Sequence, residues 1–153
     1  MAKRRSHKVQ SKRPVSLAGV RPHKSLGQNF LVDEEVIQTI VEESGVTKDS
    51  LVLEIGPGTG ALTLPLAERA GRVIAVDLDQ DMIDGLRVKT FGMDNVELIH
   101  GDILQQDIKG MTERSMAEHD LSELRIIGNL PYYITTPIIM KLLEAETGAK
   151  SIT

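Results

Sequence analysis

The sequence contains no cysteine and no tryptophan, and it has only two tyrosines and two phenylalanines among 153 residues. The absence of cysteine excludes disulfide bonds, thiolate metal sites and a cysteine nucleophile. No apolar run approaches the roughly 20 residues that span a bilayer, and the N-terminal region lacks the apolar segment of a secretory signal. The four histidines show no metal-ligand spacing. We therefore expect a cytoplasmic globular domain without membrane contact and without a bound metal.

Acidic residues are missing from the first part of the chain. Residues 1–27 contain eight lysines and arginines and no aspartate or glutamate. Since the net charge of the whole chain is -4, the remainder carries -12. We predict that residues 1–22 form a flexible basic arm that contacts a polyanion. A merely solvated tail explains the same charge pattern and stays open as an alternative.

Short apolar segments alternate with amphipathic ones along the rest of the chain. The expected strands are 51–55, 72–77, 95–99 and 123–128. Helices are expected after Asp33, from Leu62, from Gln80 and from the Thr136–Pro137 pair, with a loop and a short helix within 104–121. The strands are apolar throughout, which predicts an α/β fold with a parallel sheet covered by helices on both faces. Ligands bind such sheets at the carboxyl ends of the strands.

A glycine-rich turn follows the first expected strand, in the segment Glu54 to Gly60. Gly56 and Gly58 allow a sharp turn and the close approach of a ligand, and the next helix directs its N-terminal amides at that ligand. Asp77 ends the second strand, 21 positions after Gly56, where an acid accepts hydrogen bonds from ribose hydroxyls. The three features together predict a nucleoside-type cofactor. Alone, the turn is also a tight strand–helix connection, and Asp77 is also a helix cap.

Two further groups lie at expected strand ends. Asp102, after Gly101, is placed to accept a hydrogen bond from an adenine amino group, although a loop cap is an equal interpretation. The segment Asn129-Leu130-Pro131-Tyr132 combines an amide, a restricted backbone and an aromatic ring. The Asn129 side-chain oxygen and the Leu130 carbonyl would accept protons from the N6 amine of adenine and make its nitrogen more nucleophilic, while Tyr132 stacks on the base. A simple turn with a core tyrosine is the plain alternative.

These residues together resemble a known family, the small-subunit rRNA adenine N6,N6-dimethyltransferases of the KsgA type. The resemblance runs from about Lys24 to the end of the chain. It rests on the segments 27–31 (Gly-Gln-Asn-Phe-Leu), 54–60, 101–102 and 129–134 (Asn-Leu-Pro-Tyr-Tyr-Ile) and on Asp77.

The resemblance implies a Rossmann-like methyltransferase fold, S-adenosylmethionine as methyl donor and two adjacent adenosines near the 3′ end of small-subunit rRNA as target. It assigns catalysis to Asn129, Leu130, Pro131 and Tyr132. It assigns the cofactor to Asn29, Leu31, Gly56, Gly58, Asp77, Asp102 and Asn129. The implied partner is small-subunit rRNA within a pre-ribosomal particle, and the implied complete enzyme is a monomer.

The family has a longer catalytic domain followed by a helical RNA-binding domain, so we expect 23–153 to be the N-terminal part of the catalytic domain, with about four of seven strands. The fourth strand would then be an unpaired edge. Such a piece is expected to bind cofactor weakly and to methylate poorly. Three alternatives stay open: a large-subunit rRNA adenine dimethyltransferase of the macrolide-resistance type, a non-catalytic rRNA-binding assembly factor, and a nicotinamide-dependent oxidoreductase, which the G-x-G-x-G spacing disfavours.

Overall fold

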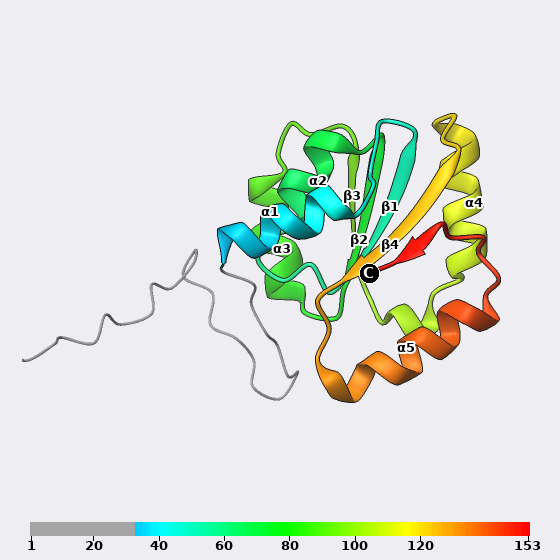
Figure 1. The fold of residues 1–153 in the computed structure, drawn as a ribbon. Coiled ribbons are helices and arrows are strands. Elements are labelled where there is room, and N and C mark those ends of the chain that lie inside the picture. Colours follow the sequence, from blue (N-terminus) through cyan, green and yellow to red (C-terminus); the bar gives the residue numbers. More distant parts are fainter. Residues whose placement is uncertain (1–32) are drawn as a thin grey trace, which may run out of the picture.

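The computed structural model describes residues 33–153, which form a parallel five-stranded sheet in the order β3-β2-β1-β4-β5 (Figure 1). The strands are β1 Ser50–Ile55, β2 Arg72–Asp77, β3 Val96–His100, β4 Glu123–Gly128 and β5 Ser151–Ile152. Every pair of neighbouring strands is parallel. The predicted α/β class and parallel sheet are confirmed.

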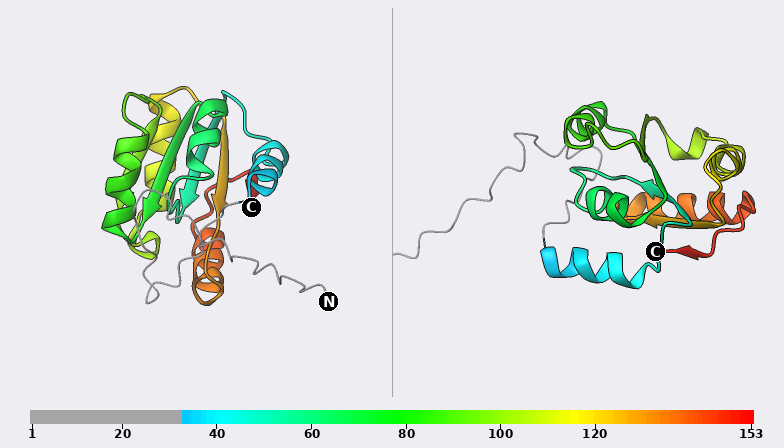
Figure 2. Two further views of the ribbon diagram at one scale, coloured as in Figure 1. Left: turned by 90° about the vertical axis from the view of Figure 1, so that its left-hand side faces the viewer. Right: turned by 90° about the horizontal axis from the view of Figure 1, so that it is seen from above.

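Helices cover both faces of the sheet, as the continuous apolar strands predicted. The helices are α1 Glu34–Glu43, α2 Thr63–Arg69, α3 Gln80–Lys89, α4 Ile108–Glu118 and α5 Tyr132–Glu144, with a 3₁₀ turn at Ile103–Gln105. The views in Figures 1 and 2 show α1, α2 and α3 on one side of the sheet and α4 and α5 on the other. None of the helices within residues 33–153 is long and apolar enough to cross a membrane.

Each face of β1 packs into its own apolar core, because side chains alternate along a strand. Leu51, Leu53 and Ile55 pack on the side of α4 and α5. Val52 packs with α1 and α2 on the other side. Glu54 alternates onto the same face as Val52, so its carboxyl group is carried into the α1–α2 side of the molecule.

The order of the strands in the sheet changes direction at β1. From β1 the chain adds β2 and β3 on one side, and then returns to place β4 on the other side of β1. Ile55 at the end of β1 pairs with Gly128 at the end of β4. The segments that follow these two strands therefore begin side by side, which is where open α/β sheets bind ligands.

The sheet has one strand more than the four that the sequence predicted. Ser151 and Ile152 form β5 and pair with Arg125 and Ile126 of β4. The expectation that β4 would be an unpaired edge is therefore wrong along this stretch. A strand of two residues is too short for its side-chain alternation to be recognised in the sequence.

The last helix begins earlier than predicted. We expected Thr136 as its cap and Pro137 in its first turn, whereas α5 starts at Tyr132 and contains Pro137 in its interior. The first turn closes on Pro131, whose carbonyl accepts from the Ile134 backbone N–H at 3.2 Å and from the Thr135 hydroxyl at 2.9 Å. These bonds start the helix directly after the Asn-Leu-Pro segment. The Thr136–Pro137 pair therefore lies inside the helix and does not mark its start.

Candidate functional site

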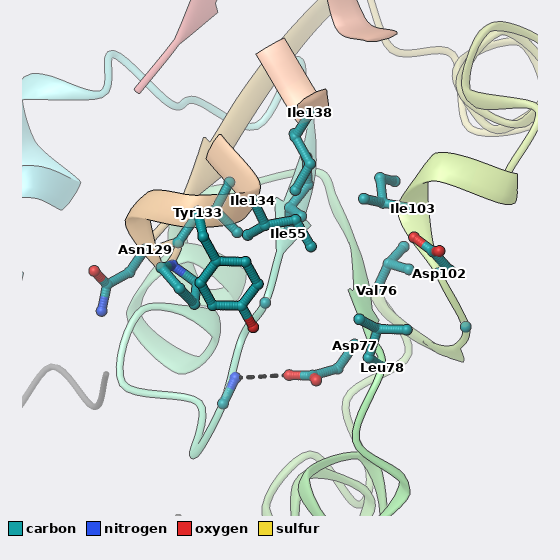
Figure 3. A pocket seen from close by; sticks show the side chains of 15 residues that line it. Ile55, Val76, Asp77, Leu78, Asp102, Ile103, Asn129, Tyr133, Ile134 and Ile138 are labelled. Carbon is teal, nitrogen blue, oxygen red and sulfur yellow. Dashed lines mark hydrogen bonds between the residues drawn. The ribbon is translucent and has the colours of Figure 1, made fainter. Parts of the chain in front are cut away.

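A pocket opens at the carboxyl edge of the sheet, where β1, β2 and β4 end (Figure 3). The chain segments that line it follow different strands and meet only in the fold. The lining residues are Ile55, Gly56, Gly58, Val76, Asp77, Leu78, Gly101, Asp102, Ile103, Asn129, Leu130, Pro131, Tyr133, Ile134 and Ile138. The structure thus brings together every described residue that was predicted to hold a cofactor, and it sets the Asn-Leu-Pro segment beside them.

The glycine-rich turn forms one wall of the pocket. Gly56 has φ +69°, a backbone conformation that side-chain-bearing residues rarely adopt, and its N–H donates to the Val76 carbonyl at 2.9 Å. The Leu130 side chain approaches the bare Gly56 Cα, because a Cβ built there would lie 3.4 Å from Leu130 Cδ2. The missing side chain of Gly56 therefore lets the segment after β4 pack closely against this wall.

Asp77 holds the turn in place from the end of β2. Its Oδ2 accepts from the Gly58 N–H at 3.1 Å, and its Oδ1 accepts from the Asp79 N–H at 2.9 Å. Burial is the main cause that raises the pKa of Asp77 above its usual range, and the two backbone hydrogen bonds oppose it. The cap of α3 is supplied by Asp79 rather than Asp77, since Asp79 accepts from the Asp81 N–H. Asp77 is therefore not the cap of α3.

Asp102 lies on the opposite wall, in the segment after β3. Its Oδ1 caps the 3₁₀ turn by accepting from the Leu104 N–H at 2.9 Å. The strand itself ends at His100, two residues earlier than the position of Asp102. The loop-cap interpretation is confirmed, and the same carboxylate still lines the pocket, so its second oxygen remains the predicted acceptor for a base.

Apolar side chains form the floor beside these carboxylates. Val76, Leu78 and Ile103 come from β2 and from the segments after β2 and β3. In Figure 3 Val76 lies between Asp77 and Asp102, and Ile103 lies beyond Asp102. A flat apolar group with polar edges fits such a slot, since its faces meet hydrocarbon while its edges meet the carboxylates. Leu78 and Ile103 were not predicted from the sequence, although they directly follow Asp77 and Asp102.

The segment after β4 closes the pocket from the other side. Asn129, Leu130 and Pro131 all line it, and the exposed ring of Tyr133 lies across its mouth with the hydroxyl directed toward the Asp77 side. The Asn129 side chain belongs to the pocket lining, but its amide group points away from Asp77 and Asp102 (Figure 3). Tyr133 was not selected from the sequence, because the preceding aromatic residue fitted the stacking role.

Three predicted site residues lie wholly or partly outside the part of the chain that the structure describes. Asn29 and Leu31 lie outside the described residues. The backbone of Tyr132 begins α5, and its side chain is likewise outside what the structure describes. Their roles remain predictions.

Glu54 is a functional candidate that was not predicted from the sequence. It is 2% exposed, and its Oε2 accepts from the Thr63 hydroxyl at 2.6 Å. The pKa of Glu54 is raised to about 7: burial is the largest cause, the Thr63 hydrogen bond opposes it, and the Asp77 carboxylate adds to it. A buried carboxyl group with a raised pKa next to the glycine-rich turn is a candidate for a functional role. The clue in the sequence was an acid inside an otherwise apolar strand.

The polar groups of the pocket suit an organic ligand. Within residues 33–153 no group of three or more histidine, aspartate or glutamate side chains is close enough to hold a metal. The pocket offers two carboxylates, turn amides and apolar walls, which together match a nucleoside-like molecule with hydroxyl and amino groups.

Sequence comparison finds both a family profile and curated relatives that match this chain. The sequence profile of the family described as ribosomal RNA adenine dimethylase matches residues 19–153. A protein of Bacillus licheniformis named ribosomal RNA small subunit methyltransferase A is 43% identical over 144 residues, which are 94% of this chain and 49% of that protein. The chain spans about half the length of the curated relatives that it matches.

Solved structures share the fold. A crystal structure of 23S rRNA methyltransferase ErmE superposes with a TM-score of 0.65 at 34% identity, covering 78% of this chain and 44% of that one. A dimethyladenosine transferase from Plasmodium falciparum gives a TM-score of 0.61 at 28% identity, covering 76% of this chain and 38% of that one. Both comparisons cover well under two thirds of the solved chains.

Proposed function

Because this chain belongs to the ribosomal RNA adenine dimethylase family, we propose that it transfers methyl groups from S-adenosylmethionine to N6 of two adjacent adenosines near the 3′ end of small-subunit rRNA. One observation carries the proposal. The Asn129–Pro131 segment and the Gly56–Asp77–Asp102 set line a single pocket, although they are separated in the sequence. A methyl donor and an acceptor amine can therefore meet in one place.

The residues present fit the cofactor. Gly56 leaves room for a ligand next to the backbone, and Asp77 offers the remaining lone pairs of two oxygens to ribose hydroxyls. Asp102 is placed for the adenine amino group, and Val76 and Ile103 for the ring faces. Asn29 and Leu31 complete the site in our proposal. The bound cofactor supplies an electrophilic methyl group on a sulfonium.

The protein's own part in the chemistry is to prepare the acceptor nitrogen. The lone pair of an adenine amine is delocalised into the ring, so the amine is a poor nucleophile. Hydrogen bonds from that amine to the Asn129 side-chain oxygen and the Leu130 carbonyl would favour a more tetrahedral nitrogen. Pro131 fixes the backbone that presents these acceptors, and Tyr132 stacks on the extruded base. The gain comes from positioning and electrostatics, without a strong general base.

Substrate recognition extends beyond the pocket. We place residues 23–153 in the N-terminal part of the catalytic domain and assign residues 1–22 to phosphate contacts, which makes RNA binding depend steeply on salt. The partner is small-subunit rRNA in a pre-ribosomal particle, met by a monomer in the cytoplasm. The curated relatives named for the small subunit support this choice.

A large-subunit substrate is the second candidate, and the similarity to 23S rRNA methyltransferase ErmE favours it. Methylation assays with separate small-subunit and large-subunit particles distinguish the two. Transfer to the large-subunit particle alone would replace the proposed substrate while leaving the proposed chemistry intact.

The cofactor assignment is tested by calorimetric titration of the chain with S-adenosylhomocysteine, S-adenosylmethionine and NAD. We expect saturable binding of the first two, a higher melting temperature in their presence, and no response to NAD. Stabilisation by NAD alone would make the protein a nicotinamide-binding one. Binding of S-adenosylhomocysteine without any transfer to rRNA particles would favour the non-catalytic assembly factor.

A further inference from the structure

Glu54 is a buried carboxyl group that has no role in the proposed chemistry, and it lies directly before the glycine-rich turn. Glu54 is on β1 and Asp77 is on the neighbouring β2, and the Asp77 carboxylate raises the pKa of Glu54, after burial as the main cause. Glu54 is 2% exposed and Asp77 is 8% exposed. Two carboxylates that share a low-dielectric site do not both ionise easily unless a positive charge joins them.

The described surroundings of Glu54 provide no such positive charge. The strand neighbours Ala75 and Ile127 are apolar, and α2 contributes the neutral Thr63 hydroxyl. On the same face α1 contributes Ile37, Ile40 and Val41 to the core. The other charged groups act on Asp77 rather than on Glu54: Asp79 raises the cost of its ionisation, and His100 lowers it.

Glu54 is also tied mechanically to the glycine-rich turn. It immediately precedes Ile55 and Gly56, which line the pocket, and it receives the hydroxyl of Thr63, the first residue of α2. The turn between β1 and α2 is therefore closed at its base by the Glu54–Thr63 hydrogen bond at 2.6 Å and at its pocket side by the Gly58–Asp77 bond. A change in the protonation of Glu54 acts on both the charge and the shape of this wall.

We propose that Glu54 is a positioning residue that couples cofactor binding to the release of a proton, so that a cationic ligand binds more tightly to the ionised Glu54–Asp77 pair. The inference rests on the proposed function, because it takes the ligand to be a cofactor with an ammonium or sulfonium group. Proton release from Glu54 on binding strengthens the affinity as the pH rises through neutrality. Thr63 tunes the effect, since its hydroxyl stabilises the ionised carboxylate.

The test is calorimetry of S-adenosylmethionine and S-adenosylhomocysteine binding to the 153-residue chain at pH 6, 7 and 8, in buffers of different ionisation enthalpy. The wild-type chain should release a fraction of a proton at pH 7, and its Kd should fall by up to about tenfold from pH 6 to pH 8. Glu54→Gln should still bind, with that pH dependence removed. The matched control Glu118→Gln, at an exposed position of α4, should keep the wild-type dependence.

Two variants of Thr63 separate this role from a purely structural one. Thr63→Ser keeps the hydroxyl and should retain the wild-type pH profile, whereas Thr63→Val removes it and should move the profile to higher pH. An unchanged profile in Glu54→Gln, or no proton release by the wild-type chain, would overturn the inference while leaving cofactor binding established. The wild-type proton count needs no variant and decides the matter even if Glu54→Gln does not fold. Failure of both ligands to bind at every pH would instead overturn the proposed function, and this inference with it.

Discussion

Leu130 and Gly56 approach each other across the ends of β4 and β1, so that a Cβ on Gly56 would lie 3.4 Å from Leu130 Cδ2. This contact joins the proposed cofactor wall to the segment proposed to hold the target amine. Ile55, the residue before Gly56, and Gly128, two residues before Leu130, are register partners. The geometry of the reaction site therefore depends on the pairing of two strands that are far apart in the sequence.

Gly56→Ala should weaken cofactor binding more than it weakens folding. Its φ of +69° costs an alanine about 1–2 kcal/mol, and the new methyl group takes space on the pocket side of the turn. We expect S-adenosylhomocysteine affinity to fall at least about tenfold, measured by calorimetry. Gly92→Ala is the matched control, because Gly92 has φ +84° and nothing lies within 4 Å of its added Cβ. Equal loss of affinity in both variants would contradict the proposed role of Gly56.

Gly60→Ala should lower the stability of the fold more than it lowers the affinity for the cofactor. A Cβ at Gly60 would lie 2.4 Å from Leu86 Cδ2, and Leu86 is buried in α3 at 1% exposure. The strained φ of +89° adds to this clash. Urea denaturation should show a loss that exceeds that of Gly92→Ala by about 1–3 kcal/mol, because only Gly60 adds overpacking. Similar losses in the two variants would mean that Leu86 moves aside freely.

Local sequence patterns predicted most of the strands and the cap of the first helix correctly. The bounds of β2 and β4 were predicted as they are found, β2 from a continuous apolar run and β4 from apolar residues interrupted only by Arg125. Asp33 caps α1 as expected, accepting from Glu35 and Val36. Pro65 lies in the first turn of α2, the only part of a helix where its missing N–H has no cost.

Features that depend on distant contacts were not predictable in the same way. β5 exists because two residues pair with β4, and its own pattern carries no signal. The start of α5 was misplaced because a local Thr136–Pro137 signal competes with bonds to Pro131. The burial of Glu54 follows from the side of the sheet on which α2 packs, which no single segment determines.

Asp77→Asn should weaken cofactor binding by about 10–100-fold, because a charged acceptor for ribose hydroxyls becomes a neutral amide. The fold should survive, since one amide oxygen can still accept from a backbone N–H. Binding is measured with S-adenosylhomocysteine, and Asp84→Asn serves as control because Asp84 is exposed and pairs with Arg87. Unchanged affinity in Asp77→Asn would remove Asp77 from the cofactor site.

Asn129→Ala should retain the fold and most cofactor affinity while methyl transfer falls by at least about 100-fold. The reason is that the side-chain oxygen is needed when charge develops on the acceptor nitrogen, whereas the pocket has many other contacts to the cofactor. Transfer of labelled methyl groups to small-subunit particles by the wild-type chain, even if slow, provides the baseline. Circular dichroism checks the fold. A variant rate close to that baseline would exclude Asn129 from the mechanism.

Stability should depend on pH through Glu54. Its pKa is raised from 4.5 to about 7, with burial as the largest cause, so between these values the folded protein holds a proton that the unfolded chain has lost. The free energy of unfolding therefore falls as the pH rises from about 5 to 8, by about 3 kcal/mol for this one group. Asp77, whose pKa is also raised, contributes in the same direction. Glu54→Gln should remove most of this slope in urea denaturation at successive pH values.

Glu123→Gln provides a control of opposite sign for that measurement. The Lys150 and Arg125 side chains lower the pKa of Glu123, so its contribution to stability is present above the unfolded pKa and is lost as the pH falls through the folded one. Its replacement should change only the acid limb below about pH 5, and Glu54→Gln only the limb above it. If Glu123→Gln flattened the neutral limb instead, the titrating group would belong to the β4–β5 edge, and the Glu54–Asp77 pair next to the glycine-rich turn would not be the source of the pH dependence.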